Sequence, residues 1–339
     1  MKKINWLLFA FLALFFLTCT KEKFQLENIE EIPTPNVINF GQLIKEDFPL
    51  YWQIHIVPNN EDEIFYQKLY LLDTIINDTL WKTIHYGAFI YNMESKEERL
   101  VTRVKMEKPD YGKKDWIIFS YSNGSTKNIW KIKSNGDSLT QLTFYGAAVY
   151  GGAVDPVWNA DGTRFIHNFY WYNYTIVADE FGHVLDTVQL NQTYHSWNSD
   201  SSVVVYDRHE SLGIQNVYTG EYRLIVDGSY TSPQVNGRSP YINDCHWLDS
   251  DHIIWKIAFE GMYITNVNSK ETIKLFDSRK SRYYPWFTYA PTKKKLFFVR
   301  NDARLLDTVH YKEVQRSWHI VMMNLDGTGE QVLDIPETK

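Results

Sequence analysis

Two short stretches of alternating apolar and polar residues set the pattern for the chain. The first, residues 128–143 (NIWKIKSNGDSLTQLT), places Ile129 before and Leu142 after a turn at Asn135-Gly136-Asp137. Alternation puts one face of a strand against a core and the other face in water. Asn and Gly tolerate the positive φ of tight hairpin turns. The stretch therefore predicts a β-hairpin.

The second stretch, residues 154–168 (VDPVWNADGTRFIHN), predicts a strand, a tight turn and another strand. Pro156 lies near a strand start, where a missing N–H is tolerated. Trp158 offers a large apolar surface just before the turn at residues 160–163. Hairpin units like the first and strand–turn–strand units like the second therefore combine into sets of four short strands.

Variants of both stretches recur along the chain. The hairpin occurs six times, with turns near Ser95, Gly136, Gly182, Gly220, Ser269 and Gly327. Each copy is preceded by a strand–turn–strand stretch, clearest at Trp158, Trp197, Trp247 and Tyr289 and weaker near Val57 and Pro109. A four-strand unit of roughly 40–55 residues has the period of a propeller blade. We predict an all-β chain that folds as a six-bladed β-propeller of four-stranded antiparallel blades.

The composition agrees with this fold and narrows the classes of function. The chain has 339 residues, of which 44% are hydrophobic, which suits one large all-β domain. Strand-favouring Tyr, Trp, Phe, Ile and Val are abundant, and beyond residue 18 no long run has the apolar spacing of a helix. The net charge of −6, without a basic block, argues against nucleic acid as a partner.

The repeat resembles the TolB-like β-propeller repeat. The resemblance is carried by DPVWNADGTRFIH, NIWKIKSNGDSLTQLT and IVMMNLDGTGEQVL, and it extends over nearly all of the chain after the N-terminal segment. It implies a six-bladed propeller and says nothing about activity. TolB proteins also carry an N-terminal α/β domain, for which residues 20–48 are too short.

The N-terminus predicts export. Lys2 and Lys3 precede an apolar run that ends at Leu17, which is too short to span a membrane comfortably and has the length of a signal-peptide core. Cys19 follows and resembles the lipid-modified cysteine of bacterial lipoproteins, whose acyl chains anchor a protein to a membrane. A plain secretory signal and an N-terminal anchor helix are the alternatives.

These features divide the chain into three parts. Residues 1–18 are a lipoprotein-type signal peptide, residues 19–48 a lipid-anchored tether, and residues 49–339 the propeller. Pro33 and Pro35 forbid a regular helix in the tether, and residues 36–40 are a candidate outer strand. We expect the protein in the bacterial cell envelope, anchored to the outer membrane. Once Cys19 is acylated, Cys245 is a lone thiol, expected to be buried beside Trp247.

The connections between the predicted strands are unequal. In a four-stranded blade, the first-to-second and third-to-fourth turns lie on one face, here called the short-turn face. The second-to-third and blade-to-blade connections, which are longer here, lie on the opposite, long-loop face.

Long loops on a rigid scaffold commonly carry binding sites, and aromatic residues and Arg are favoured at them. The predicted binding residues are Trp171, Tyr172, Tyr194, Arg208, His209, Tyr241, Tyr283 and Tyr284. About half of such aromatic residues are expected to fill gaps between blades instead.

Polar residues near the starts of the innermost strands are weak candidates for chemistry at the channel mouth. They are Asp155, His195, Asp244 and His246. An Asp/His set can bind a metal ion or act as acid and base, but capping and loop hydrogen bonds explain the same residues. The sequence contains no G-x-S-x-G, H-E-x-x-H, Walker or Rossmann glycine motif. We therefore predict no cofactor and no metal.

Two hypotheses about function follow. The first is a non-enzymatic, envelope-tethered propeller that binds a protein or glycan partner through its long-loop face. The alternative is a polysaccharide-active enzyme, a lyase or hydrolase, with its site at the channel mouth.

Overall fold

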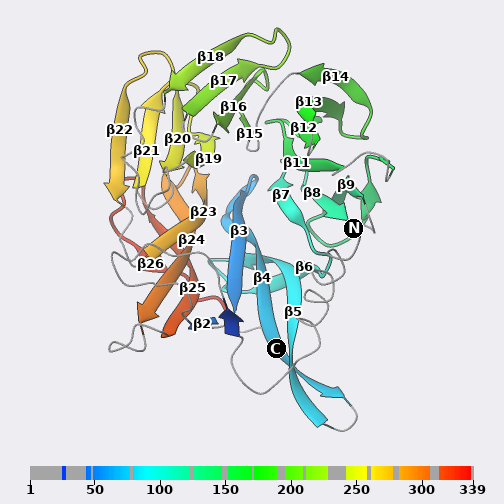
Figure 1. The fold of residues 1–339 in the computed structure, drawn as a ribbon, viewed down its shortest axis with the longest axis vertical. Coiled ribbons are helices and arrows are strands. Elements are labelled where there is room, and N and C mark those ends of the chain that lie inside the picture. The colour runs from blue at the N-terminus through cyan, green and yellow to red at the C-terminus, as the bar shows by residue number, and fades with distance from the viewer. Residues whose placement is uncertain are drawn as a thin grey trace, which may run out of the picture.

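The computed structural model describes residues 25–27, 43–46, 49–76, 79–122, 126–146, 152–169, 172–188, 195–208, 211–227, 242–257, 261–277, 282–305 and 313–336. Regular structure in these ranges is entirely β, arranged as six sheets around a central axis (Figure 1). The described part of the chain contains no helix long and apolar enough to cross a membrane. The predicted six-bladed, all-β fold is confirmed.

Each blade uses four strands that are consecutive in sequence and antiparallel. Blade one is β3 (Leu50–Val57), β4 (Asn60–Ile76), β5 (Thr79–Asn92) and β6 (Glu98–Thr102). Blade two is β7 (Glu107–Tyr111), β8 (Trp116–Ser122), β9 (Lys127–Lys133) and β10 (Thr140–Gln141), and blade three is β11 (Ala153–Trp158), β12 (Arg164–Phe169), β13 (Tyr172–Asp179) and β14 (Val184–Val188).

The remaining blades follow the same order. Blade four is β15 (His195–Trp197), β16 (Val203–Arg208), β17 (Ser211–Asn216) and β18 (Tyr222–Val226). Blade five is β19 (Ile242–Trp247), β20 (His252–Ile257), β21 (Gly261–Asn266) and β22 (Thr272–Asp277). Blade six is β23 (Arg282–Ala290), β24 (Lys295–Leu305), β25 (Glu313–Asn324) and β26 (Gln331–Val332). The six predicted hairpins are the third and fourth strands of the six blades.

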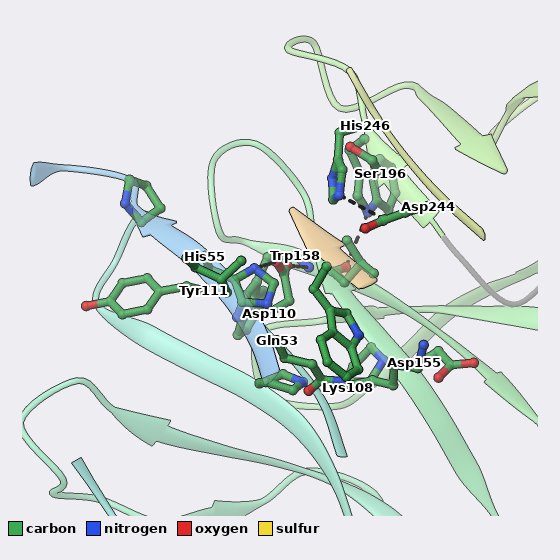
Figure 2. A pocket seen from close by; sticks show the side chains of 18 of the residues that line it. Gln53, His55, Lys108, Asp110, Tyr111, Asp155, Trp158, Ser196, Asp244 and His246 are labelled. Atoms are coloured by element: carbon green, nitrogen blue, oxygen red, sulfur yellow. Dashed lines mark hydrogen bonds and ion pairs between the residues drawn. The ribbon is translucent and has the colours of Figure 1, made fainter. Parts of the chain in front are cut away.

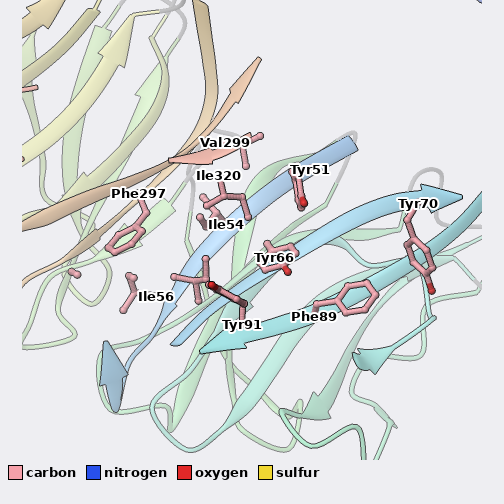
Figure 3. Packing of buried hydrophobic residues seen from close by; sticks show 12 residues of the cluster. Tyr51, Ile54, Ile56, Tyr66, Tyr70, Phe89, Tyr91, Phe297, Val299 and Ile320 are labelled. Atoms are coloured by element: carbon pink, nitrogen blue, oxygen red, sulfur yellow. The ribbon is translucent and has the colours of Figure 1, made fainter. Parts of the chain in front are cut away.

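Each blade takes all four of its strands from its own repeat. Blades one and six are therefore joined by side-chain packing, which closes the ring. One apolar cluster contains Ile54, Tyr66 and Tyr91 of blade one with Phe297 and Ile320 of blade six (Figure 3). Hydrogen bonds reinforce the seam. The Glu61 carboxylate accepts the N–H groups of Thr292 and Lys293, both at 2.9 Å, and the Tyr91 hydroxyl donates to the Asp334 carbonyl at 2.9 Å.

Two further strands lie within the segment predicted as a tether. β2 (Leu43–Glu46) pairs in parallel with the start of β25, and β1 (Gln25–Glu27) pairs antiparallel with β2. They extend the sheet of blade six beyond its own four strands. The strand predicted at residues 36–40 lies outside the described residues, as do the signal segment and Cys19.

Two connections predicted as irregular loops are instead long hairpins. β4 and β5 stay in register from the Glu63–Asn92 pair to the Ile76–Thr79 pair, and Figure 1 shows this hairpin projecting from the ring. β24 and β25 are similarly paired out to Leu305 and Val314. Pairing satisfies the backbone N–H and C=O groups that a loop would leave to water. The long-loop face therefore carries β structure at blades one and six.

The glycines of the hairpin turns set how closely neighbouring blades approach. Gly182 has φ +91°, and a Cβ added there would lie 2.2 Å from the carbonyl oxygen of Leu142 in the preceding blade. Gly136 meets the carbonyl oxygen of Val101 at 2.5 Å in the same way. Gly220, with φ +72°, occupies the equivalent turn of blade four, but nothing lies within 4 Å of its would-be Cβ.

These two turns form a matched pair for a stability test. We expect Gly220→Ala to lower the free energy of unfolding by about 1–2 kcal/mol, the usual cost of a left-handed backbone for a residue with a Cβ. Gly182→Ala carries that cost and also drives its Cβ into the backbone of blade two, so we expect a further loss of about 1–3 kcal/mol. Urea denaturation measures both. Equal losses would show that the close contact between blades two and three is unimportant.

Candidate functional site

The innermost strands carry the candidate site because a bulge interrupts most of them at the same level. The register shifts in β3, β7, β11, β19 and β23. Gln53, Lys108 and Asp155 have positive φ values of 47°, 48° and 54° at these bulges. Proline occupies the bulges of β7, β11 and β23, where the interrupted ladder needs no N–H. Each bulge re-aims the side chains that follow it along the strand.

One position near the end of the innermost strand lines the central cavity in blades one to five. It is the second residue before the first turn and is occupied by His55, Asp110, Val157, Ser196, His246 and Thr288 in blades one to six. We call its five polar members the inner polar ring: His55, Asp110, Ser196, His246 and Thr288. Three of them accept a backbone N–H from the next blade: Asp110 from Trp158 at 2.7 Å, Ser196 from Trp247 at 3.4 Å, and Thr288 from Ile56 at 3.3 Å.

Four members of the ring, all except Thr288, line a cavity of about 450 Å³. All six innermost strands line it, and residues of the first turns, Pro58, Lys113 and Ala160, complete its wall towards the short-turn face. Figure 2 shows His55 beside Asp110 on one part of the wall, and His246 joined to Asp244 near Ser196 on another. The cavity therefore extends along the axis from the bulges to the turns.

Asp244 and His246 form an ion pair on β19. The His246 Nε2 atom lies 3.0 Å from Asp244 Oδ1, and the two side chains are 33% and 13% exposed. Burial opposes ionisation of Asp244, but the charge and hydrogen bond of His246 outweigh it and lower the pKa of the carboxyl. Burial also opposes protonation of His246, yet Asp244 raises the pKa of the imidazole. The pair thus favours the ionised carboxylate of Asp244 and the protonated form of His246 at the cavity wall.

Lys256 on β20 lies close enough to Asp244 for their charges to interact, and it also joins blade five to blade six. Its ammonium donates to the carbonyl oxygens of Tyr284 at 2.8 Å and Pro285 at 2.5 Å. Burial lowers the pKa of Lys256 to about 8, against the opposing charge of Asp244. The bulge carbonyls of blade six are in this way attached to blade five.

His55 and Asp110 have a weaker contact, with 3.7 Å between His55 Nδ1 and Asp110 Oδ1. Burial raises the pKa of Asp110 to about 6, although the Trp158 N–H and the charge of His246 oppose that rise. Burial, followed by the charge of His246, lowers the pKa of His55 to about 4. His55 is therefore neutral near pH 7, and Asp110 is an acid whose charge is poorly compensated.

Asp155 is the third carboxyl of the cavity wall. Burial raises the pKa of Asp155 to about 6, while the charge of Lys108 and a hydrogen bond from Asn168 oppose the rise. Three carboxyl groups from blades two, three and five therefore share the cavity with Lys108 and His246. Among the residues with described side chains, no group of three or more His, Cys, Asp or Glu is arranged to hold a metal ion.

The structure brings together three of the four residues predicted at the channel mouth. Asp155, Asp244 and His246 line one cavity. His195 begins β15, but its side chain is outside the described part, as are Trp171, Tyr194, His209 and Tyr241. Tyr172, Arg208 and Tyr283 are described only as strand backbone.

Tyr284 is a correction to the predicted binding residues. It is only 5% exposed, packs against Phe298 with ring centroids 5.1 Å apart, and donates its hydroxyl to Glu330 at 2.9 Å. The bulge at Pro285 shifts the register of β23, so Tyr284 points into the gap between blades five and six.

Four residues of the cavity wall were not predicted from the sequence: Gln53, His55, Lys108 and Asp110. Their blades carry the two weakest copies of the first-half repeat, which hides their equivalence to the other blades. Aligning every copy on the second residue before its first turn places His55 and Asp110 in register with His246. This alignment could have identified His55 and Asp110 as cavity residues from the sequence.

Comparisons with known proteins identify the fold. No protein-family model and no curated protein match the sequence. The structure of a putative TolB from Agrobacterium tumefaciens matches with TM-score 0.53 and 13% identity, over 72% of this chain and 86% of that one. The β-propeller domain of the Trilobed protease from Pyrococcus furiosus matches with TM-score 0.52 and 12% identity, over 86% and 97%.

A third similar structure is a larger enzyme. Acylaminoacyl peptidase from Pyrococcus horikoshii matches with TM-score 0.51 and 11% identity over 84% of this chain, which spans only 52% of the peptidase. At these identities the similarities establish a TolB-like six-bladed propeller fold and nothing about activity.

The raised pKa of Asp110 leads to a test of pH dependence. Between about pH 4 and about pH 6 the unfolded chain releases a proton that folded Asp110 keeps, so the free energy of unfolding falls as pH rises. Asp110→Asn removes this effect and keeps an oxygen for the Trp158 N–H. We expect the stability of the variant relative to wild type to rise by on the order of 2–3 kcal/mol across that window and stay level above it.

The variant must be compared with wild type at each pH because His55 makes the free energy of unfolding change with pH in the opposite direction. Its lowered pKa makes the wild-type protein lose stability as pH falls from about 6.5 to about 4. Urea denaturation across the window measures the difference, with Asp186→Asn on the exposed strand β14 as the control. A relative stability of Asp110→Asn that does not change with pH would contradict the buried, uncompensated carboxyl.

Proposed function

We propose that this TolB-like propeller is a non-enzymatic binding protein of the cell envelope, which holds a protein or glycan partner at its central cavity. The observation that carries the proposal is the composition of the inner polar ring. Ser196 and Thr288 link neighbouring blades with a hydroxyl alone. The same structural task therefore needs neither the buried carboxyl of Asp110 nor the imidazoles of His55 and His246.

A rigid wall supports binding at this site. The side chains that line the cavity come from strands of all six blades, so the site is formed before a ligand arrives. Its volume of about 450 Å³ falls within the range of about 300–1,000 Å³ typical of small-molecule sites. The long-loop face predicted from the sequence lies towards the opposite end of the axis and is a separate candidate binding surface.

One observation favours the alternative of a polysaccharide-active enzyme. Asp244 orients His246 through Nε2, which leaves Nδ1 of the same ring to exchange a proton with a ligand. Asp110, with its pKa near 6, is a second proton-transfer group on the same cavity. Turnover of a bound saccharide would move the assignment to this class.

Partner capture tests the proposed function. We expect purified protein, immobilised and incubated with envelope extract, to retain a partner that His246→Gln retains at least about tenfold less well, because the imidazole facing the cavity is lost. His252→Gln is the matched control. It removes a histidine of the same blade that also pairs with an aspartate, Asp249, at 2.9 Å, but lies outside the cavity.

A second comparison in the same assay separates the cavity from the loops. Replacing Trp171 and Tyr172 by Ala should weaken capture if the long-loop face extends the contact. Undiminished capture by both His246→Gln and the Trp171/Tyr172 double variant would refute binding at either place. Circular dichroism and thermal unfolding establish that each variant is folded.

The proposed tether has its own test. We expect Cys19→Ser to move the protein from the membrane fraction to the soluble fraction and to abolish incorporation of labelled palmitate, because the acyl chains supply the membrane affinity. Cys245→Ser should leave both unchanged, since that thiol is buried in β19. Membrane association that survives Cys19→Ser would favour an N-terminal anchor helix instead.

A further inference from the structure

The charges on the cavity wall are mixed. Three of the lining residues are acidic and three are basic (Figure 2). The acidic side chains are Asp110, Asp155 and Asp244, and the basic side chains are Lys108, Lys113 and His246. An anionic ligand would face the three carboxyl groups, and a cationic ligand would face Lys108 and the His246 imidazolium. Neither sign of charge is favoured over the whole wall, so an uncharged ligand suits it best.

The wall also presents hydrogen-bond donors and acceptors side by side. Carboxylate oxygens accept, while the lysine ammonium and the imidazolium donate. A hydroxyl group does both, so a ligand rich in hydroxyls can pair with each kind of group in turn. A purely apolar ligand would instead bury these charges without partners, at a cost of several kcal/mol per ion.

Two buried polar atoms on the wall have no partner in the structure. They are the carboxamide oxygen Oε1 of Gln53 and the indole Nε1 of Trp158. Trp158 is only 6% exposed, so the missing hydrogen bond is expensive. One atom is an acceptor and the other a donor, and both are enclosed by neighbouring atoms, so a ligand hydroxyl reaches them only if those side chains move.

Aromatic surface completes the site. Trp286 on β23 is half-buried and lines the cavity, whereas its neighbour Phe287 is only 2% exposed and packs against the His246 ring. Sugar rings present hydroxyls at their edges and C–H groups on their faces, and the faces pack on aromatic rings. Mixed charge, paired donors and acceptors, and flat apolar surface thus occur together in one cavity of about 450 Å³.

We propose that the cavity binds a neutral saccharide, either free or as the end of a glycan chain. This inference rests on the proposed function, because it names the ligand class of the same site. His246 and Asp110 hold ring hydroxyls as donor and acceptor, Gln53 contributes its carboxamide, and Trp286 supports a sugar face.

The test uses the folded propeller and a defined panel. Saturation-transfer NMR and calorimetry are run with neutral mono- to trisaccharides of hexoses and N-acetylhexosamines, with uronic acids and amino sugars of the same size, and with short peptides. We expect binding of at least one neutral saccharide, and at least about tenfold weaker binding to His246→Gln and to Gln53→Asn. Gln53→Asn withdraws the carboxamide and keeps a residue that tolerates positive φ. His252→Gln should bind as wild type does.

Each other outcome has a distinct meaning. Binding only of uronic acids, amino sugars or peptides, with the same dependence on His246, overturns the neutral saccharide and leaves the cavity as a binding site. Saccharide binding that both cavity variants retain overturns this site. Failure of the whole panel overturns the ligand class, and partner capture by His246→Gln then decides separately whether the proposed function survives. Recovery of the saccharide intact or cleaved distinguishes binding from turnover.

Discussion

The structure depends on satisfying the backbone of six strands that have a sheet partner on one side only. Each innermost strand pairs with the second strand of its blade, and its other edge faces the axis. An unpaired N–H in the interior costs free energy comparable to a lost hydrogen bond. Asp110, Ser196 and Thr288 accept such N–H groups from the next blade. Asp110 and Ser196, which join neighbouring blades in this way, therefore also line the cavity.

The repeat pattern was sufficient to predict the blades but not the details that bulges decide. Turn residues such as Gly136 and Gly182 recur with the blade period, and the fold follows from that recurrence. Tyr284 was predicted on the long-loop face because the segment before Pro285 was taken as a connection between blades, whereas in the structure it belongs to β23 and its ring is buried. The hairpin of β4 and β5 was read as a loop because it extends beyond the four-strand repeat unit, although Leu71, Ile75 and Leu80 give the segment an apolar, strand-like composition.

The site was predicted in part for the same reason. Asp155, Asp244 and His246 belong to blades with clear repeats, so their position near the axis could be inferred from the sequence. His55 and Asp110 sit in the two least regular copies, and their roles depend on contacts between blades, which a pattern within one repeat does not contain. The altered pKa values of these groups arise from burial in the assembled ring, and no local motif encodes them.

Two charged groups in this chain, Lys68 and Asp110, differ in how a neighbouring charge compensates theirs. Lys68 is 1% exposed and faces Glu98 at 2.5 Å, with the Phe89 ring 4.3 Å from its ammonium, so each charge has a dedicated partner inside blade one. Asp110 lacks such a partner, because the neighbouring His55 is neutral near pH 7. A hydroxyl at the equivalent position already joins blades four and five. Because a serine would serve the fold at this position, the costly carboxyl of Asp110 supports the proposal that this wall binds a ligand.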